Sequence, residues 1–128
     1  MYIDEECNCN PGELMLFPCA GACNVGQLAN DLTKEMTNRG IGKMACIAAV
    51  GGGGMMAINA AKGAKVILVV DGCPVGCARK ILERNGIAPT LQVIVTDIGM
   101  KKTDTLSYSK EEMDKMFEYT LEKLRSVK

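Results

Sequence analysis

The stretch that decides the predicted fold is "VILVVDGCPVGCARK", residues 66–80. Five apolar residues without a polar break lead into an Asp-Gly pair, and Cys73 and Cys77 follow where a helix is expected to begin. A strand that is apolar throughout is typical of a parallel sheet covered by helices on both faces. This stretch therefore predicts a buried strand, a short loop and a helix over residues 74–86.

The same succession of strand, loop and helix recurs along the chain. Short apolar runs predict strands at residues 14–17, 43–50, 65–70 and 90–99. Because strands and helices alternate, we expect a parallel sheet with right-handed crossovers. The fold class is therefore α/β: a three-layer, Rossmann- or flavodoxin-like domain with strand order 2-1-3-4 and helices on both faces. In such a sheet, ligands bind beyond the carboxyl ends of the first and third strands, where the strand order reverses.

Two helices are predicted from apolar residues at helical spacing. The first follows the first strand and ends at Gly40; its apolar face contains Val25, Leu28, Ala29, Leu32 and Met36. The second closes the chain after an N-cap at Ser109; its apolar face contains Met113, Met116, Phe117, Leu121 and Leu124. Charged residues occupy the other faces of the closing helix, so the pattern gives no prediction of oligomeric state.

Length and composition exclude several classes of protein. A chain of 128 residues, 48% of them hydrophobic, suits one domain, which we place at residues 14–128 after an N-terminal arm at residues 1–13. Lys plus Arg equals Asp plus Glu, 15 against 15, so no basic surface is available for nucleic acid. No signal peptide is recognisable, and no apolar run approaches the ~18 residues of a membrane span. We expect a cytoplasmic protein without a membrane partner.

Seven cysteines and no histidine indicate metal or redox chemistry based on sulfur. An odd number of cysteines in an α/β pattern argues against a disulfide framework. The absence of histidine excludes imidazole ligands and Ser-His-Asp triads. Any metal ion would therefore be held mainly by cysteine.

Five of the cysteines fall near the expected ligand crevice. Cys19 and Cys23 follow the first strand, Cys73 and Cys77 follow the third, and Cys46 is expected on the second strand. A spacing of four residues lets both members of a pair face one point, and a helix N-terminus lowers the pKa of a thiol. Four sulfurs at ~2.3 Å would satisfy a tetrahedral zinc ion. The spacing alone favours Cys23 as the fourth ligand.

The sequence resembles the DGC domain family, zinc-binding proteins named after a central Asp-Gly-Cys motif. The resemblance rests on "FPCAGACNVGQLAN", "GKMACIAAVGGG", "VVDGCPVGCARK" and "VIVTDIG", which span most of the chain. It implies a site of four chelating cysteines and specifies no activity. The positions that match are Cys19, Cys46, Cys73 and Cys77, whereas the position of Cys23 often holds another small residue. The resemblance therefore favours Cys46 as the fourth ligand, and we place Cys46 before Cys23, which stays a candidate ligand.

Two further features have alternative interpretations. Cys7 and Cys9 form a C-x-C pair on the N-terminal arm, where they could transfer a soft metal ion. Gly51, Gly52 and Gly53 either permit a tight turn or cradle a small anionic ligand with their backbone amides. No Lys follows these glycines in the register of a nucleotide-binding P-loop.

The predicted function is metal binding, most simply of zinc, in the service of sensing, storage or transfer of metal. The first alternative is an iron–sulfur or thiol-redox protein, because cysteine ligation does not distinguish zinc from iron. The second is an enzyme: Cys73 and Arg79 have the C-x5-R spacing of phosphatase loops, with Asp97 as an available general acid. Against this enzyme, Lys80 stands where such loops usually place Ser or Thr.

Overall fold

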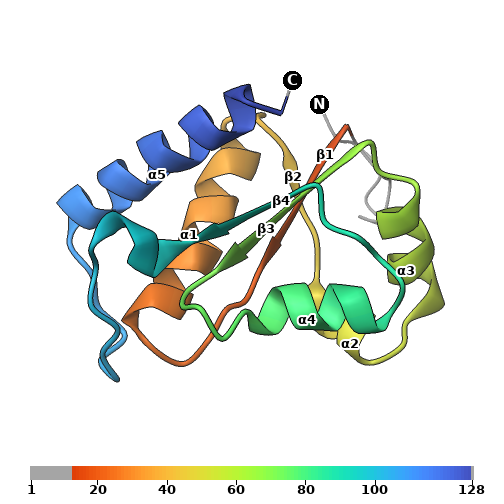
Figure 1. The fold of residues 1–128 in the computed structure, drawn as a ribbon, viewed down its shortest axis with the longest axis horizontal. Helices are drawn as coiled ribbons and strands as arrows, with labels where there is room; N and C mark the ends of the chain where they lie inside the picture. Colours follow the sequence, from red (N-terminus) through yellow and green to blue (C-terminus); the bar gives the residue numbers. More distant parts are fainter. Residues whose placement is uncertain (1–12, 128) are drawn as a thin grey trace.

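Figure 1 shows the computed structural model of the chain, in which residues 13–127 are described. Four parallel strands form one sheet in the order β2-β1-β3-β4, as predicted. The strands are β1 (Leu14–Pro18), β2 (Lys43–Met44), β3 (Val66–Asp71) and β4 (Leu91–Ile94). Because β1 and β3 lie side by side at the centre, their carboxyl ends open into the same crevice.

Helices cover both faces of the sheet (Figure 1), which confirms the predicted α/β class. One face is covered by α1 (Asn24–Asn38) and α5 (Lys110–Arg125). The other face is covered by α2 (Ile47–Gly51), α3 (Met55–Lys62) and α4 (Cys77–Arg84). A short 3₁₀ helix, η1 (Val95–Ile98), follows β4. Within residues 13–127, no helix combines the length and the apolar character that a membrane crossing requires.

The central strands β1 and β3 contribute alternate side chains to two hydrophobic cores. Leu16, Leu68 and Val70 face α1 and α5, whereas Phe17 and Val69 face the opposite helices. All five side chains are fully buried. Burial on both faces explains why the β3 sequence has no polar break before Asp71.

The two predicted apolar helix faces are confirmed. The buried residues of α1 include all five of its predicted stripe. In α5, Met116, Phe117 and Leu124 are buried, and Met113 and Leu121 pack partly buried against the same core. The N-cap Ser109 forms a capping box with Glu112, in which each side chain binds the backbone N–H of the other residue.

Two predicted strands are too long. The second ends at Met44, and residues 47–51 form helix α2, so Cys46 is the N-cap of a helix and lies on no strand. Residues 45–51 are mostly small, and alanine is the best helix former, so an apolar run of this composition suits a helix equally well. The fourth strand ends at Ile94, and η1 occupies the remainder of the predicted strand.

Candidate functional site

Four cysteines line one small cavity at the carboxyl ends of β1 and β3. This cysteine cavity has a volume of about 180 Å³, and its lining includes Cys19, Cys23, Cys73 and Cys77. Cys77 is exposed, and the other three are partly buried. The two C-x3-C segments thus meet in the crevice where the strand order reverses, as their positions in the sequence predict.

Glycines allow the two cysteine loops to approach each other. A Cβ atom on Gly72 would lie 2.8 Å from the backbone nitrogen of Gly26, and a Cβ atom on Gly26 would lie 2.5 Å from the carbonyl oxygen of Gly21. Both distances are too short for any side chain. The end of β3, the first turn of α1 and the loop after β1 are therefore in direct backbone contact.

The loop after β1 turns sharply at Ala20. This residue has a φ of +52°, in the left-handed region that a residue with a side chain rarely adopts. On one side of the turn, the Cys19 N–H donates to the carbonyl of Val70, and the Cys19 Sγ accepts a hydrogen bond of 3.3 Å from the Gly72 N–H. Cys19 is therefore fixed against the end of β3 by both its backbone and its side chain.

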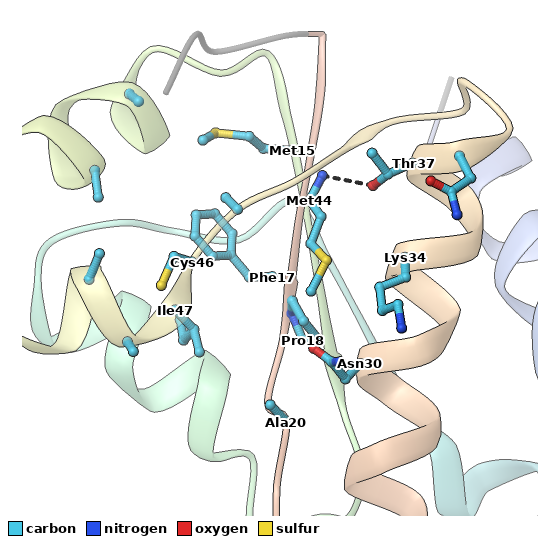
Figure 2. A pocket seen from close by; sticks show the side chains of 16 residues that line it. Met15, Phe17, Pro18, Ala20, Asn30, Lys34, Thr37, Met44, Cys46 and Ile47 are labelled. Atoms are coloured by element: carbon cyan, nitrogen blue, oxygen red, sulfur yellow. Dashed lines mark hydrogen bonds between the residues drawn. The ribbon is translucent and has the colours of Figure 1, made fainter. Parts of the chain in front are cut away.

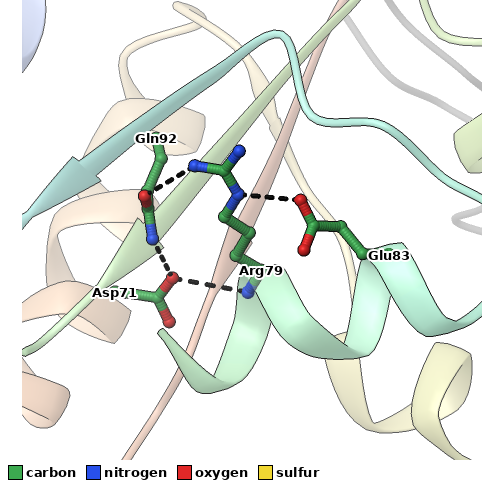
Figure 3. Close-up of polar contacts among 4 residues, drawn as sticks. All are labelled: Asp71, Arg79, Glu83 and Gln92. Carbon is green, nitrogen blue, oxygen red and sulfur yellow. Dashed lines mark hydrogen bonds and ion pairs between the residues drawn. The ribbon is translucent and has the colours of Figure 1, made fainter. Parts of the chain in front are cut away.

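Asp71 organises the second loop. Its side chain is almost completely buried, and its carboxylate accepts hydrogen bonds from the backbone N–H of Ala78 at 2.8 Å and of Arg79 at 3.3 Å. The Nε2 of Gln92 donates a third hydrogen bond, of 2.9 Å (Figure 3). A carboxylate at a helix N-terminus satisfies free backbone N–H groups and interacts favourably with the helix dipole. Asp71 thus ties the first turn of α4, and with it Cys77, to the end of β3.

Arg79 points away from the four cysteines. Its guanidinium contacts the carboxylate of Glu83 through Nε at 2.9 Å and the Gln92 Oε1 through Nη1 at 2.9 Å (Figure 3). It is not among the residues that line the cysteine cavity. A phosphatase loop directs its arginine to a phosphate held above the nucleophilic cysteine. The observed contacts therefore give no support to the C-x5-R interpretation.

Sequence reasoning missed two residues of the site, Asn24 and Lys102. The buried side chain of Asn24 accepts from the Thr103 N–H at 2.7 Å and donates to the Lys101 carbonyl at 2.8 Å. These bonds hold the loop after η1 against the first turn of α1. The loop in turn places the Lys102 Nζ 3.5 Å from the Cys73 Sγ. Asn24 could have been predicted from the sequence, because it is a polar residue at the start of a helix. No local sequence pattern distinguishes Lys102.

Burial alters the electrostatics of one thiol, that of Cys19. Burial raises the pKa of the Cys19 thiol, and hydrogen bonds from the Gly21 and Gly72 N–H groups offset this effect only in part. This direction is opposite to the one that a helix N-terminus alone would give. The hydrogen bond with the Cys73 sulfur raises the pKa of Lys102, which favours a cation beside the sulfurs.

Cys46 lies apart from the other four cysteines. It is exposed, and it lines a separate cavity between α1 and α2. Of the two candidates for a fourth ligand, the structure therefore brings Cys23 to the cysteine cavity and leaves Cys46 elsewhere. Cys7 and Cys9 lie outside the described residues.

The predicted anion cradle forms the connection between α2 and α3. Gly51 ends α2, Gly54 is the N-cap of α3, and Gly53 adopts a φ of +81°. All of these glycines are exposed, and none lines the cysteine cavity. The positive φ explains why the turn requires glycine at position 53. Anion binding by these glycines stays a prediction.

The donor atoms of the site suit a thiophilic metal ion, but they do not lie close enough together to hold one. Among residues 13–127, no three cysteine or carboxylate side chains form a group close enough to hold a metal ion. The Sγ atoms of Cys19 and Cys23 both lie 3.8 Å from the position that a Cβ atom of residue 21 would take. A bound ion would therefore require rotation of the thiols towards a common centre.

Comparisons with known proteins agree with the resemblance seen in the sequence motifs. The model of the DGC domain matches residues 15–120. The protein named "Anaerobic and virulence modulator AnvM" from Pseudomonas aeruginosa is 38% identical over 88 residues, which cover 69% of this chain and 67% of that protein. No solved structure matches the chain. The chain belongs to the DGC domain family.

Proposed function

We propose that the cysteine cavity binds a thiophilic metal ion, most simply zinc, through Cys19, Cys23, Cys73 and Cys77. One observation carries the proposal: two strand-to-helix junctions, more than 50 residues apart in the sequence, contribute four thiols to one cavity of about 180 Å³. Four thiolates satisfy a tetrahedral zinc ion without any other ligand. Because the chain contains no histidine, sulfur is also the only soft donor available.

The surroundings of the cavity can support the charge of such a site. Four thiolates around a divalent ion carry a net charge of about −2. The Lys102 ammonium lies 3.5 Å from the Cys73 sulfur, and the Gly72 N–H donates to the Cys19 sulfur at 3.3 Å. Outer groups of this kind orient ligands and stabilise the charge of a thiolate site. The polar contacts around the thiols are therefore those that a metal–thiolate centre requires.

The role that we propose for this metal is regulatory: sensing, or transfer to another molecule. The two hydrophobic cores are formed by side chains of β1, β3, β4 and the helices, and Cys19, Cys23 and Cys73 only pack against them partly buried, so the fold has a source of stability other than the metal. Cys77 is exposed, which gives a partner or an oxidant access to one sulfur. The relative from Pseudomonas aeruginosa is named as a modulator, which agrees with a regulatory role.

Elemental analysis of protein purified without oxygen, together with its visible spectrum, tests the proposal. The expected result is colourless protein with about one zinc ion per chain, released by a chelator. Brown protein that contains iron and sulfide would show that the cavity holds an iron–sulfur cluster in place of zinc. Protein that binds no metal even when zinc is supplied under reducing conditions would contradict the proposal and leave thiol-redox chemistry as the function of the four cysteines.

A further inference from the structure

A second and larger cavity lies along the outer edge of the sheet, where β2 ends after two residues. This apolar cavity has a volume of about 620 Å³, within the range of small-molecule sites. Its apolar lining comes from β1, the segment after β2, and α3, and includes Met15, Phe17, Ile47 and Ala60. Figure 2 shows Phe17, Cys46 and Ile47 on one side of the cavity and α1 on the other.

Helix α1 supplies the polar side of the apolar cavity. Asn30, Lys34 and Thr37 are spaced three or four residues apart and therefore share one face of the helix. Asn30 and Lys34 line the same cavity as Pro18 and Met44 (Figure 2). Thr37 is already engaged, because its Oγ1 accepts a hydrogen bond of 2.9 Å from the Met44 N–H. The amides of Asn30 and Asn38 and the ammonium of Lys34 are the polar groups that a bound molecule would meet.

The lining carries a positive charge that is only weakly compensated. Within the described part of the chain, Lys34 is the single charged residue of this cavity, and no carboxylate lines it. The carboxylate of Asp31 is 3.7 Å from the Lys34 Nζ and also accepts a hydrogen bond from the Tyr108 hydroxyl. An exposed ion pair of this length contributes little, so the Lys34 ammonium can exchange Asp31 for an anionic ligand.

We propose that the apolar cavity binds a small amphipathic anion, with its apolar body against Phe17 and Ile47 and its anionic head at Lys34 and Asn30. An apolar wall with a few polar groups at one side is the usual arrangement of small-molecule sites. Pro18 makes a peptide a poor occupant, because an added strand needs backbone donors along the open edge of β1 and proline has none. This proposal does not depend on metal binding at the cysteine cavity.

Nuclear magnetic resonance of the methionine methyl groups, with decanoate as the probe, tests the proposal. Met15 and Met44 line the apolar cavity, whereas Met36 and Met116 are buried in the other core. Decanoate, added below the concentration at which it forms micelles, should shift the methyl signals of Met15 and Met44 in a saturable way and leave those of Met36 and Met116 unchanged. Shifts of all four signals, or of none, would overturn the proposal.

Two variants separate the contributions of the anionic head and the apolar body. Lys34→Gln should weaken decanoate binding roughly twofold to fivefold, within the range of an exposed ion pair, and should leave binding of decanol unchanged. Lys115→Gln, on α5 and outside the cavity, is the matched control and should bind decanoate like the unmodified protein. Ala57→Phe places a large side chain in the cavity and should abolish binding of both probes. Equal decanoate affinity in Lys34→Gln and Lys115→Gln would overturn the assignment of the head group.

Discussion

The junctions that follow β1 and β3 differ sharply from the junction that follows β2, although all three carry cysteine. At the first two, backbone contacts between glycines and the hydrogen bonds of Asp71 bring four thiols to one cavity. At the third, Cys46 caps a short helix beside a wide cavity with mostly apolar walls. A cysteine at the end of a strand thus does not by itself join the other thiols; the loops that carry the thiols must also be held together.

The largest expected effect comes from breaking the glycine contact between the two cysteine loops. In Gly72→Ala, the new Cβ atom would meet the Gly26 nitrogen at 2.8 Å and the Val25 carbonyl carbon at 2.9 Å, and backbone atoms cannot move aside cheaply. We expect the free energy of unfolding to fall by about 3 kcal/mol, at the upper end for overpacking, and metal affinity to fall as well. Chemical denaturation followed by circular dichroism measures the first effect.

Gly51→Ala is the matched control for this substitution. A Cβ atom on Gly51 would meet only side-chain atoms of Ile81, at 3.6 Å or more, and Gly51 lies in helix α2 with no positive φ. Because alanine is a better helix former than glycine, this variant should be as stable as the unmodified protein or slightly more stable. If both alanine variants were equally stable, close packing would not be what holds the cysteine loops together.

A smaller effect is expected from removing the charge of Asp71. In Asp71→Asn, the side chain retains one acceptor oxygen, and an N–H₂ group replaces the other. The N–H₂ group cannot accept a hydrogen bond, so the variant loses part of the bonding to the three donors that the carboxylate binds. We expect a loss of about 1–2 kcal/mol in the free energy of unfolding. The exposed Asp97→Asn should change it by no more than about 0.5 kcal/mol. Similar values for the two variants would mean that Asp71 does not organise the loop after β3.

The smallest effect concerns the contact between Tyr108 and Asp31 of α1. Burial, followed by the hydrogen bond and the charge of Asp31, raises the pKa of Tyr108 to about 12. Because the folded-state pKa exceeds the unfolded value, this group stabilises the fold fully below pH ~10, and the contribution is lost as the pH rises towards ~12. An alkaline absorbance titration of the unmodified protein and of Tyr108→Phe gives the signal of Tyr108 as the difference between the two curves. This difference should therefore have its midpoint at pH ~12. A midpoint at pH ~10 would show that the contact is not maintained in solution.

The sequence was sufficient to predict the strand order, because each apolar strand is followed by a helical pattern and the central strand has no polar break. It was insufficient for residues 45–51, where small apolar residues suit both a strand and a helix. In the site, the spacing of four residues indicated Cys23, which lines a cavity with Cys19, Cys73 and Cys77, whereas Cys46, which the resemblance favoured, lines another cavity. Lys102 could not be predicted, because its approach to Cys73 depends on a loop held by Asn24 from across the molecule.

The zinc content of Cys23→Ser and Cys46→Ser, prepared in parallel, tests the proposed metal site most directly. The structure brings Cys23 to the cysteine cavity and leaves Cys46 beside the apolar cavity, so the two substitutions should differ although each removes one thiol. We predict that Cys23→Ser loses stoichiometric zinc at a chelator concentration at which Cys46→Ser retains about one ion per chain. Loss of zinc from Cys46→Ser with retention in Cys23→Ser would contradict the account.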